Sequence, residues 1–210
     1  MLINHERILI KQVVDAWEIV LPIESRNRYE LFDESGNKIF YAYELPGLFW
    51  WSWLVRALLV YLRPFTIRVV DQENNLLIEV QRPFRFYFHC VTVYGDGRRR
   101  LGYVERRFNL IHKLYRVSKP DGSLLCELKG PFWRPWTFDI VQDGKRYGAV
   151  RKSWSGALKE IFTDADMFGL QFPDGASQDE KSLLLAAVFL IDFVHFEGNP
   201  GTGHLPSVDI

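Results

Sequence analysis

The sequence has little cysteine, no excess charge of either sign and no leader-like start. Two cysteines, Cys90 and Cys126, in 210 residues exclude a disulfide framework. Lysine plus arginine and aspartate plus glutamate each number 26, and this balance argues against a nucleic-acid binder. The start of the chain has no basic flank followed by an apolar run, so we expect a cytoplasmic protein rather than a secreted one.

Constellations that carry enzyme or metal chemistry are also missing from the sequence. It contains no glycine-rich phosphate loop and no nucleophile elbow. The five histidines, His5, His89, His112, His195 and His204, are not spaced as metal ligands. His89 and His195 fall in apolar stretches, and we expect both to be core or wall residues with hydrogen-bond partners. The sequence therefore predicts a protein that is not an enzyme.

The chain is rich in aromatic residues and repeats itself. Residues 68–108 and 116–154 are two copies of one pattern. The corresponding pairs are Arg68-Val69 and Arg116-Val117, Pro83-Phe84 and Pro131-Phe132, and Gly102-Tyr103 and Gly148-Ala149. Repeated strand-rich units that cannot bury a face alone are expected to share one core. We therefore predict a single domain over residues 1–197, followed by a flexible tail over 198–210.

Strand patterns dominate the domain. Alternating or β-branched stretches lie at 8–14, 28–32, 38–44, 65–70, 76–80, 86–93, 101–105, 110–117, 124–128, 136–141 and 146–151, with turn signals between them. Short strands joined by tight turns indicate an antiparallel meander. Closing the meander into a barrel removes its exposed edges, so we expect a mainly β protein built as a closed antiparallel barrel.

The segment 181–197, KSLLLAAVFLIDFVHFE, has helical character and is apolar on every side until Asp192. Such a helix belongs in a membrane or in a protein interior. At about 24 Å it falls short of the roughly 30 Å hydrocarbon core, and a carboxylate makes spanning less favourable. We therefore expect a helix threaded through the barrel. Its predicted buried residues include Leu184, Ala187, Leu190 and Ile191.

A second helical segment, 48–62, has a narrow polar stripe and three tryptophans. Tryptophan-rich helices of this kind lie in the headgroup layer, where arginines reach toward phosphates. Packing of the helix against the barrel wall is an equally good interpretation. On the first interpretation, the membrane-contacting residues are Trp50, Trp51, Trp53, Arg56 and Arg63.

Five segments resemble a known family from residue 64 onward: RPFTIRVVD (63–71), QRPFRF (81–86), LGYVERRF (101–108), WSGALKEIFTDADMFGLQFP (154–173) and FLIDFVHFE (189–197). They are similar to segments of the phospholipid scramblase family. The resemblance implies a tubby-like barrel of twelve strands around a buried C-terminal helix. It also implies a membrane-associated, phospholipid-binding protein that promotes calcium-dependent movement of phospholipids between leaflets.

The resemblance also implies features that this sequence matches unevenly. Animal members of the family have a proline-rich arm and a cysteine cluster that is palmitoylated. Here the arm is missing and the corresponding stretch holds Cys90 alone. Because one acyl chain gives marginal binding, we expect the tryptophan segment to replace the lipid anchor.

The stretch implied to bind calcium contains Asp164, Asp166, Gly169 and Asp174. It matches an EF-hand loop at the first, third and sixth positions, but its fifth position is Phe168 and its twelfth is Gly175. We expect at most a weak calcium site through Asp164, Asp166 and Asp174. The alternative is that an aspartate caps a turn while Phe168, Leu170 and Phe172 form an ordinary strand.

Two basic runs are the remaining candidates for contact with anionic headgroups. Arg98–Arg100 with Arg106 and Arg107 form the first, and Lys145, Arg146, Arg151 and Lys152 form the second. They occupy matching regions of the two repeats, so we expect them in register on one barrel face.

The leading hypothesis is a scramblase-like, peripheral membrane protein. The alternatives are a soluble tubby-like regulatory module and a carrier or enzyme that uses the barrel interior, for which a filled barrel leaves little room.

Overall fold

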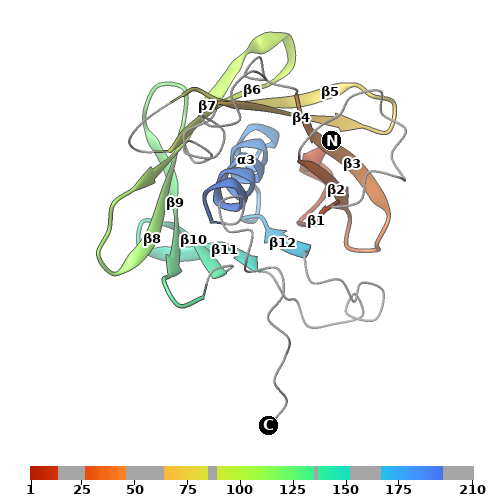
Figure 1. The fold of residues 1–210 in the computed structure, drawn as a ribbon. Helices are drawn as coiled ribbons and strands as arrows, with labels where there is room; N and C mark the ends of the chain where they lie inside the picture. The colour runs from red at the N-terminus through yellow and green to blue at the C-terminus, as the bar shows by residue number, and fades with distance from the viewer. Residues whose placement is uncertain (14–26, 46–63, 85–88, 135–136, 152–166, 196–210) are drawn as a thin grey trace, which may run out of the picture.

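The computed structural model describes residues 1–13, 27–45, 64–84, 89–134, 137–151 and 167–195. In this part of the chain, twelve strands form one closed antiparallel barrel in which sequence neighbours pair and β1 closes against β12 (Figure 1). The strands are β1 (Arg7–Gln12), β2 (Arg28–Phe32), β3 (Lys38–Glu44), β4 (Phe65–Asp71), β5 (Leu76–Arg82), β6 (Cys90–Tyr94), β7 (Arg100–Arg107), β8 (His112–Ser118), β9 (Leu124–Pro131), β10 (Thr137–Gln142), β11 (Lys145–Arg151) and β12 (Met167–Gln171). The described helices are η1 (Leu2–Asn4), η3 (Asp96–Arg98) and α3 (Gln178–His195). The predicted closed barrel is confirmed.

Each of the eleven predicted strands occurs; those at 28–32 and 38–44 have the predicted bounds, and the other nine have shifted ends. The twelfth, β12, lies where the calcium interpretation and the strand interpretation competed. Phe168 and Leu170 of β12 are buried in the core, and Gly169 pairs with Leu9 of β1 and Arg151 of β11. Phe168 and Leu170 therefore lie in a strand, as the strand interpretation predicts, whereas Phe172 lies just beyond its end, and β12 closes the barrel against β1.

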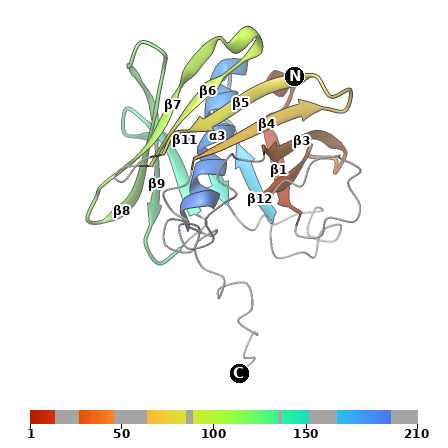
Figure 2. The same cartoon turned by 45° about the horizontal axis from the view of Figure 1, so that its top comes forward.

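The C-terminal helix α3 fills the barrel (Figures 1 and 2). Every residue from Lys181 to Val194 is buried, and Leu184, Ala187, Leu190 and Ile191 are each at most 1% exposed. Burial on all sides requires a helix that is apolar on all sides, which explains the composition of this segment. The buried helix is thus confirmed, while the predicted tail from residue 198 lies outside the described residues.

Polar contacts fix both ends of α3 within the barrel. Ser177 and Glu180 form a capping box, in which the Glu180 N–H donates to Ser177 Oγ (3.3 Å) and the Ser177 N–H donates to Glu180 Oε2 (3.0 Å). Lys181 Nζ donates to the carbonyl of His5 at 2.7 Å. Farther along, the Tyr29 hydroxyl donates to Asp192 Oδ2 at 2.5 Å. Asp192 is therefore a bonded group of the interior.

Within the described part of the chain, no helix is both long and apolar enough to cross a membrane.

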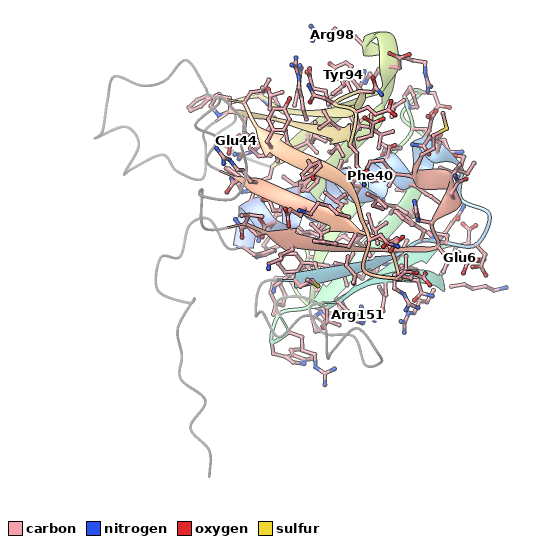
Figure 3. The ribbon with its side chains drawn as sticks, turned by 90° about the vertical axis from the view of Figure 1, so that its right-hand side faces the viewer. Glu6, Phe40, Glu44, Tyr94, Arg98 and Arg151 are labelled. Atoms are coloured by element: carbon pink, nitrogen blue, oxygen red, sulfur yellow. The ribbon has the colours of Figure 1, made fainter. Side chains whose placement is uncertain are left out.

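The barrel has two ends that differ in their connections. At one end, called the turn end, short connections join successive strands at residues 33–37, 72–75, 95–99, 119–123 and 143–144. At the other, called the loop end, lie the connections 13–27, 45–64, 83–89, 108–111, 132–136 and 152–166. In Figure 3, Glu44 marks the loop end, and Glu6 and Arg98 mark the turn end. Because α3 begins after β12, it runs from the turn end to the loop end, where His195 is its last residue.

Candidate functional site: the loop end of the barrel

Apolar side chains project from the loop end on three successive described connections. Between β7 and β8, Phe108 is 79% exposed and Leu110 is 83% exposed, and Ile111 beside them is also exposed. The Asn109 side chain fixes this turn, because its Oδ1 accepts hydrogen bonds from the N–H groups of Ile111 (2.8 Å) and His112 (3.0 Å). An exposed, locally braced group of large apolar side chains is typical of a contact surface.

The two repeats contribute matching aromatic residues to the same end. Phe84 follows β5 and Phe132 follows β9, both within Pro-Phe pairs of the repeat, and both are exposed. Trp133, next to Phe132, is 76% exposed. We call the six residues Phe84, Phe108, Leu110, Ile111, Phe132 and Trp133 the apolar rim.

The turn end differs in chemistry. Its exposed large hydrophobic side chains among the described residues are the aliphatic Met1, Ile3, Leu76 and Leu124, and the exposed aromatic Tyr147 lies near this end in β11. It also carries an open polar depression of about 310 Å³, lined by Asn4, His5, Glu6, Asp33, Glu34 and Ser35. The Asp33 carboxylate there accepts hydrogen bonds from the N–H groups of Ser35 (2.9 Å) and Asn37 (2.8 Å). This carboxylate therefore belongs to a turn.

Inside the loop end, four consecutive strands each place one basic residue at an inward-facing position. Alternation along a strand puts every second residue on one face. Arg82 follows the inward Ile78 and Val80 of β5, His89 precedes Val91 and Val93 of β6, Arg106 follows Val104 of β7, and Lys113 precedes Tyr115 and Val117 of β8. We call Arg82, His89, Arg106, Lys113 and the helix-terminal His195 the inner basic cluster.

Contacts at the end of α3 involve three members of the cluster, Arg82, His89 and His195. The Arg82 guanidinium lies over the Phe193 ring with Cζ 4.4 Å from its centroid, and its Nη2 lies 2.6 Å from His89 Nδ1. His195 Nε2 lies 2.9 Å from the buried Tyr115 hydroxyl. The expectation that His89 and His195 have hydrogen-bond partners is confirmed.

Burial and mutual repulsion depress the basicity of the cluster. Burial, followed by the charges of Lys113 and Arg106, lowers the pKa of His195 to about 3. Burial, followed by Arg82 and Arg106, lowers the pKa of His89 to about 4. Burial and then Arg106 lower the pKa of Lys113. Both histidines are therefore neutral near pH 7, and Arg82, Arg106 and Lys113 supply the positive charge.

The opposite side of the loop end has a polar network of its own. Gln12 Nε2 donates to Asn27 Oδ1 at 3.3 Å, and Asn27 Nδ2 donates to Glu44 Oε2 at 2.9 Å. Between this network and the cluster stands β4, whose Phe65 pairs directly with Arg82. The inner wall of the loop end is therefore divided, with positive charge on the side of β5 to β8.

The predicted membrane-contacting residues belong to a connection at this same end. Trp50, Trp51, Trp53, Arg56 and Arg63 lie outside the described residues. They belong to the connection 45–64, which leaves the barrel after Glu44 and re-enters it at Phe65, both at the loop end. Cys90, the first residue of β6, is half-buried at this end, while Cys126 is buried in the core.

Of the three predicted calcium ligands, Asp174 alone lies among the described residues. Asp164 and Asp166 lie outside the described residues, but Asp166 precedes Met167, which begins β12 at the loop end. Asp174 lies in an exposed turn beyond the opposite end of β12, and five strand residues cover about 13 Å. Because Gly169 is extended and paired within β12, it does not form the sharp turn of an EF-hand loop. Among the described residues, no three His, Cys, Asp or Glu side chains are arranged to hold a metal ion.

The expectation that the two basic runs form matching patches on one barrel face is wrong. Arg98–Arg100 lie at the turn end, where Arg99 makes a bidentate pair with Asp179 (2.8 and 2.9 Å), while Arg106 lies at the loop end and faces inward. The second run divides in the same way, because Lys145 and Arg151 are the first and last residues of β11. A run that is compact in sequence is therefore split along a strand.

Comparison with known proteins places this barrel in a family. A family model for scramblases matches residues 1–198. The chain belongs to the scramblase family. The match also covers the first 62 residues, which lie outside the segments that carry the sequence resemblance.

Named relatives support the same assignment. Phospholipid scramblase 2 of Bos taurus is 27% identical over 210 residues, covering 93% of this chain and 70% of the relative. Phospholipid scramblase 2 of Homo sapiens is 28% identical over 206 residues, covering 91% and 68%. Phospholipid scramblase family member 5 of Homo sapiens is 26% identical over 204 residues, covering 90% and 73%. No solved structure gave a significant match.

Proposed function

We propose that this scramblase-family barrel is a peripheral membrane protein that binds phospholipid surfaces through its loop end and promotes scramblase-like movement of phospholipids. The observation that carries the proposal is the apolar rim, in which aromatic and aliphatic side chains from three described connections are exposed at one end of the barrel. Aromatic side chains favour the membrane interface because they are largely apolar and tolerate its polar groups. The names of the relatives supply the substrate class, phospholipids.

The apolar rim and the inner basic cluster behind it match the layers of a membrane surface, in which phosphates lie just outside the acyl boundary. Phe108, Leu110 and Ile111 follow Arg106 and Arg107 directly in the chain. Side chains inserted into the acyl boundary would therefore leave these arginines at the depth of the headgroup phosphates. Basic residues near an anionic surface contribute about 1 kcal/mol each, so charge adds to the larger apolar contribution.

Lipid movement is tested by reconstitution into vesicles that carry a fluorescent phospholipid. A membrane-impermeant reductant bleaches about half of the label when lipid stays in its leaflet, and more when lipid exchanges. We expect faster bleaching of the inner-leaflet label in vesicles with protein than in vesicles without it. Bleaching equal to that of protein-free vesicles, with the protein demonstrably bound, would leave membrane binding standing and reject lipid movement.

Calcium dependence is proposed as a weak effect of the segment before β12. Asp164 and Asp166 belong to a connection at the loop end, where an ion could join carboxylates and lipid phosphates, whereas Asp174 lies at the turn end. We expect a calcium affinity in the millimolar range that is lost in Asp164→Asn/Asp166→Asn and retained in Asp174→Asn. Titration calorimetry decides this, and micromolar affinity or survival in the double variant would contradict it.

Attachment is expected to depend on the tryptophan segment more than on Cys90. Burial contributes about 25 cal/mol per Å², and an aromatic side chain buries about 150–250 Å². Half-insertion of Trp50, Trp51 and Trp53 would thus supply roughly 5–10 kcal/mol before ordering costs, with Arg56 and Arg63 adding about 1 kcal/mol each. In liposome co-sedimentation we expect Trp50→Ala/Trp51→Ala/Trp53→Ala to bind weakly and Cys90→Ser to bind normally. Unchanged binding of the triple variant would mean that this segment packs on protein.

A further inference from the structure

We propose that the inner basic cluster binds the phosphate monoester of an anionic lipid headgroup, with Arg106 and Lys113 as its principal ligands. The proposal rests on the proposed function, because it requires the loop end to meet a membrane. It goes further by assigning a headgroup site inside the barrel mouth and a headgroup chemistry to that site.

The first support is the position of the two principal residues. Arg106 and Tyr115 are register partners on β7 and β8, and Lys113 lies two residues before Tyr115 on the same inward face. The one connection 108–111 joins the two strands, so Phe108 is two residues from Arg106, and Ile111 is two residues from Lys113. At about 3.3 Å of rise per residue, insertion of Phe108 and Ile111 holds both cations within about 7 Å of the apolar boundary. Lipid phosphates occupy that layer.

The second support is the uncompensated charge. Within the residues that the structure describes, Arg106 and Lys113 make no ion pair. The carboxylates of β7 and of the neighbouring β9 pair with other cations: Glu105 with Arg107 at 2.6 Å, and Glu127 with Arg116 at 3.1 Å and Lys129 at 2.8 Å. Among the residues that the structure describes, these outward pairs leave Arg106 and Lys113 without a carboxylate partner. Burial, followed by the charge of Arg106, disfavours the ammonium form of Lys113 and lowers its pKa.

The third support is the form of the ligand set. Lys113 is 9% exposed, while Arg106 and His89 are half-buried, so Arg106 and His89 offer the more accessible surface of the cluster. An arginine supplies a planar fork of donors and a lysine supplies a point charge, the two means by which proteins bind phosphate. The neutral imidazole of His89 adds a further hydrogen-bonding group beside Arg82.

A phosphate monoester fits this set better than a phosphate diester does. A monoester carries a charge of about −1.5 to −2 at pH 7 and three terminal oxygens, whereas the diester of an ordinary headgroup carries one negative charge. Arg82, Arg106 and Lys113 are three cations on one wall. The more highly charged group therefore compensates more of their repulsion and accepts more of their hydrogen bonds.

The test compares vesicles of phosphatidylcholine with phosphatidylglycerol and vesicles of phosphatidylcholine with phosphatidic acid, adjusted to equal zeta potential. We expect wild type to bind the phosphatidic acid vesicles about tenfold more tightly, which corresponds to one charge-assisted hydrogen bond. Arg106→Gln/Lys113→Gln should lose this preference, because its affinity for phosphatidic acid vesicles falls further than its affinity for phosphatidylglycerol vesicles. Arg107→Gln/Lys129→Gln, which removes the same charge from outward positions, should keep the preference. Arg106→Lys, which keeps the charge and loses the fork, should show a reduced preference.

The outcomes separate the site from the membrane function. No binding to either vesicle would reject the proposed function itself. Equal binding to both vesicles by wild type, or a preference retained in the inward double variant, would overturn the headgroup site alone. Displacement of the protein from phosphatidic acid vesicles by equimolar glycerol 3-phosphate would assign the site to a soluble phosphate and overturn the lipid source. Thermal unfolding of each variant serves as the folding control, and the graded effect of Arg106→Lys tests the site in a variant that keeps the cation.

Discussion

A lysine in place of Ala187 is expected to unfold the barrel. Ala187 is fully buried at the middle of α3, between the barrel walls. An ammonium group introduced there has no partner, and a charge without a partner in a protein interior costs several kcal/mol. Since a domain of this kind is stable by about 5–15 kcal/mol, this single change removes a large part of the stability or all of it.

Circular dichroism and thermal unfolding measure this effect. Leu76→Lys is the matched control, because Leu76 is an exposed residue of β5 and its replacement adds the same charge without burying it. We expect the control to melt within a few degrees of wild type. A folded Ala187→Lys variant with an unchanged melting temperature would show that α3 is not enclosed by the strands.

Loss of membrane binding is the expected result of replacing the rim residues Phe108, Leu110 and Ile111 by serine. Each of these side chains is largely exposed, so the replacement leaves the barrel core intact. Full burial of one such side chain is worth about 1.5–3 kcal/mol. Even half-insertion of all three would therefore supply about 2–4 kcal/mol, and its loss would weaken the partition coefficient roughly 30- to 1,000-fold.

The control for this prediction is Leu76→Ser/Leu124→Ser, which removes exposed leucines from the turn end. Co-sedimentation with vesicles containing phosphatidylglycerol should give wild-type binding for the control and little binding for the rim variant. Equal loss in both variants would mean that binding follows total apolar exposure. Loss in the control alone would place the membrane at the turn end.

The fold could be predicted from the sequence because its signals are local and repeated. Alternation marks strands, and a segment that is apolar on every side, too short to span and interrupted by Asp192 indicates a helix inside the barrel. The interaction of Asp192 with Tyr29 could not be predicted, because 163 residues separate them. Strand β12 was ambiguous because Gly169 and the flanking aspartates suit a loop as well as a strand.

The functional end was harder to predict because its residues come from different strands. They share a site only if they face the same side of the sheet and lie at the same end of the barrel. Arg106 and Arg107 are neighbours in sequence, yet one faces the interior and the other pairs with Glu105 outside. A sequence signal for the inner basic cluster exists: Arg82, His89, Arg106 and Lys113 all continue the inward phase of a strand within one residue of its end at the loop end. The rim had a signal as well, in the Pro-Phe pair that ends β5 and β9 in the two repeats.

The orientation of the bound barrel tests the central claim most directly. In a Cys90→Ser background, single cysteines at Leu110 and at Leu124 place a polarity-sensitive fluorophore at the loop end and at the turn end. Cys126 should stay unlabelled, because it is buried and burial raises the pKa of its thiol to about 12. On vesicles with nitroxide-bearing lipids, we predict a blue-shifted and quenched signal from position 110 and an unchanged signal from position 124. Quenching at position 124 with none at position 110 would contradict attachment through the loop end.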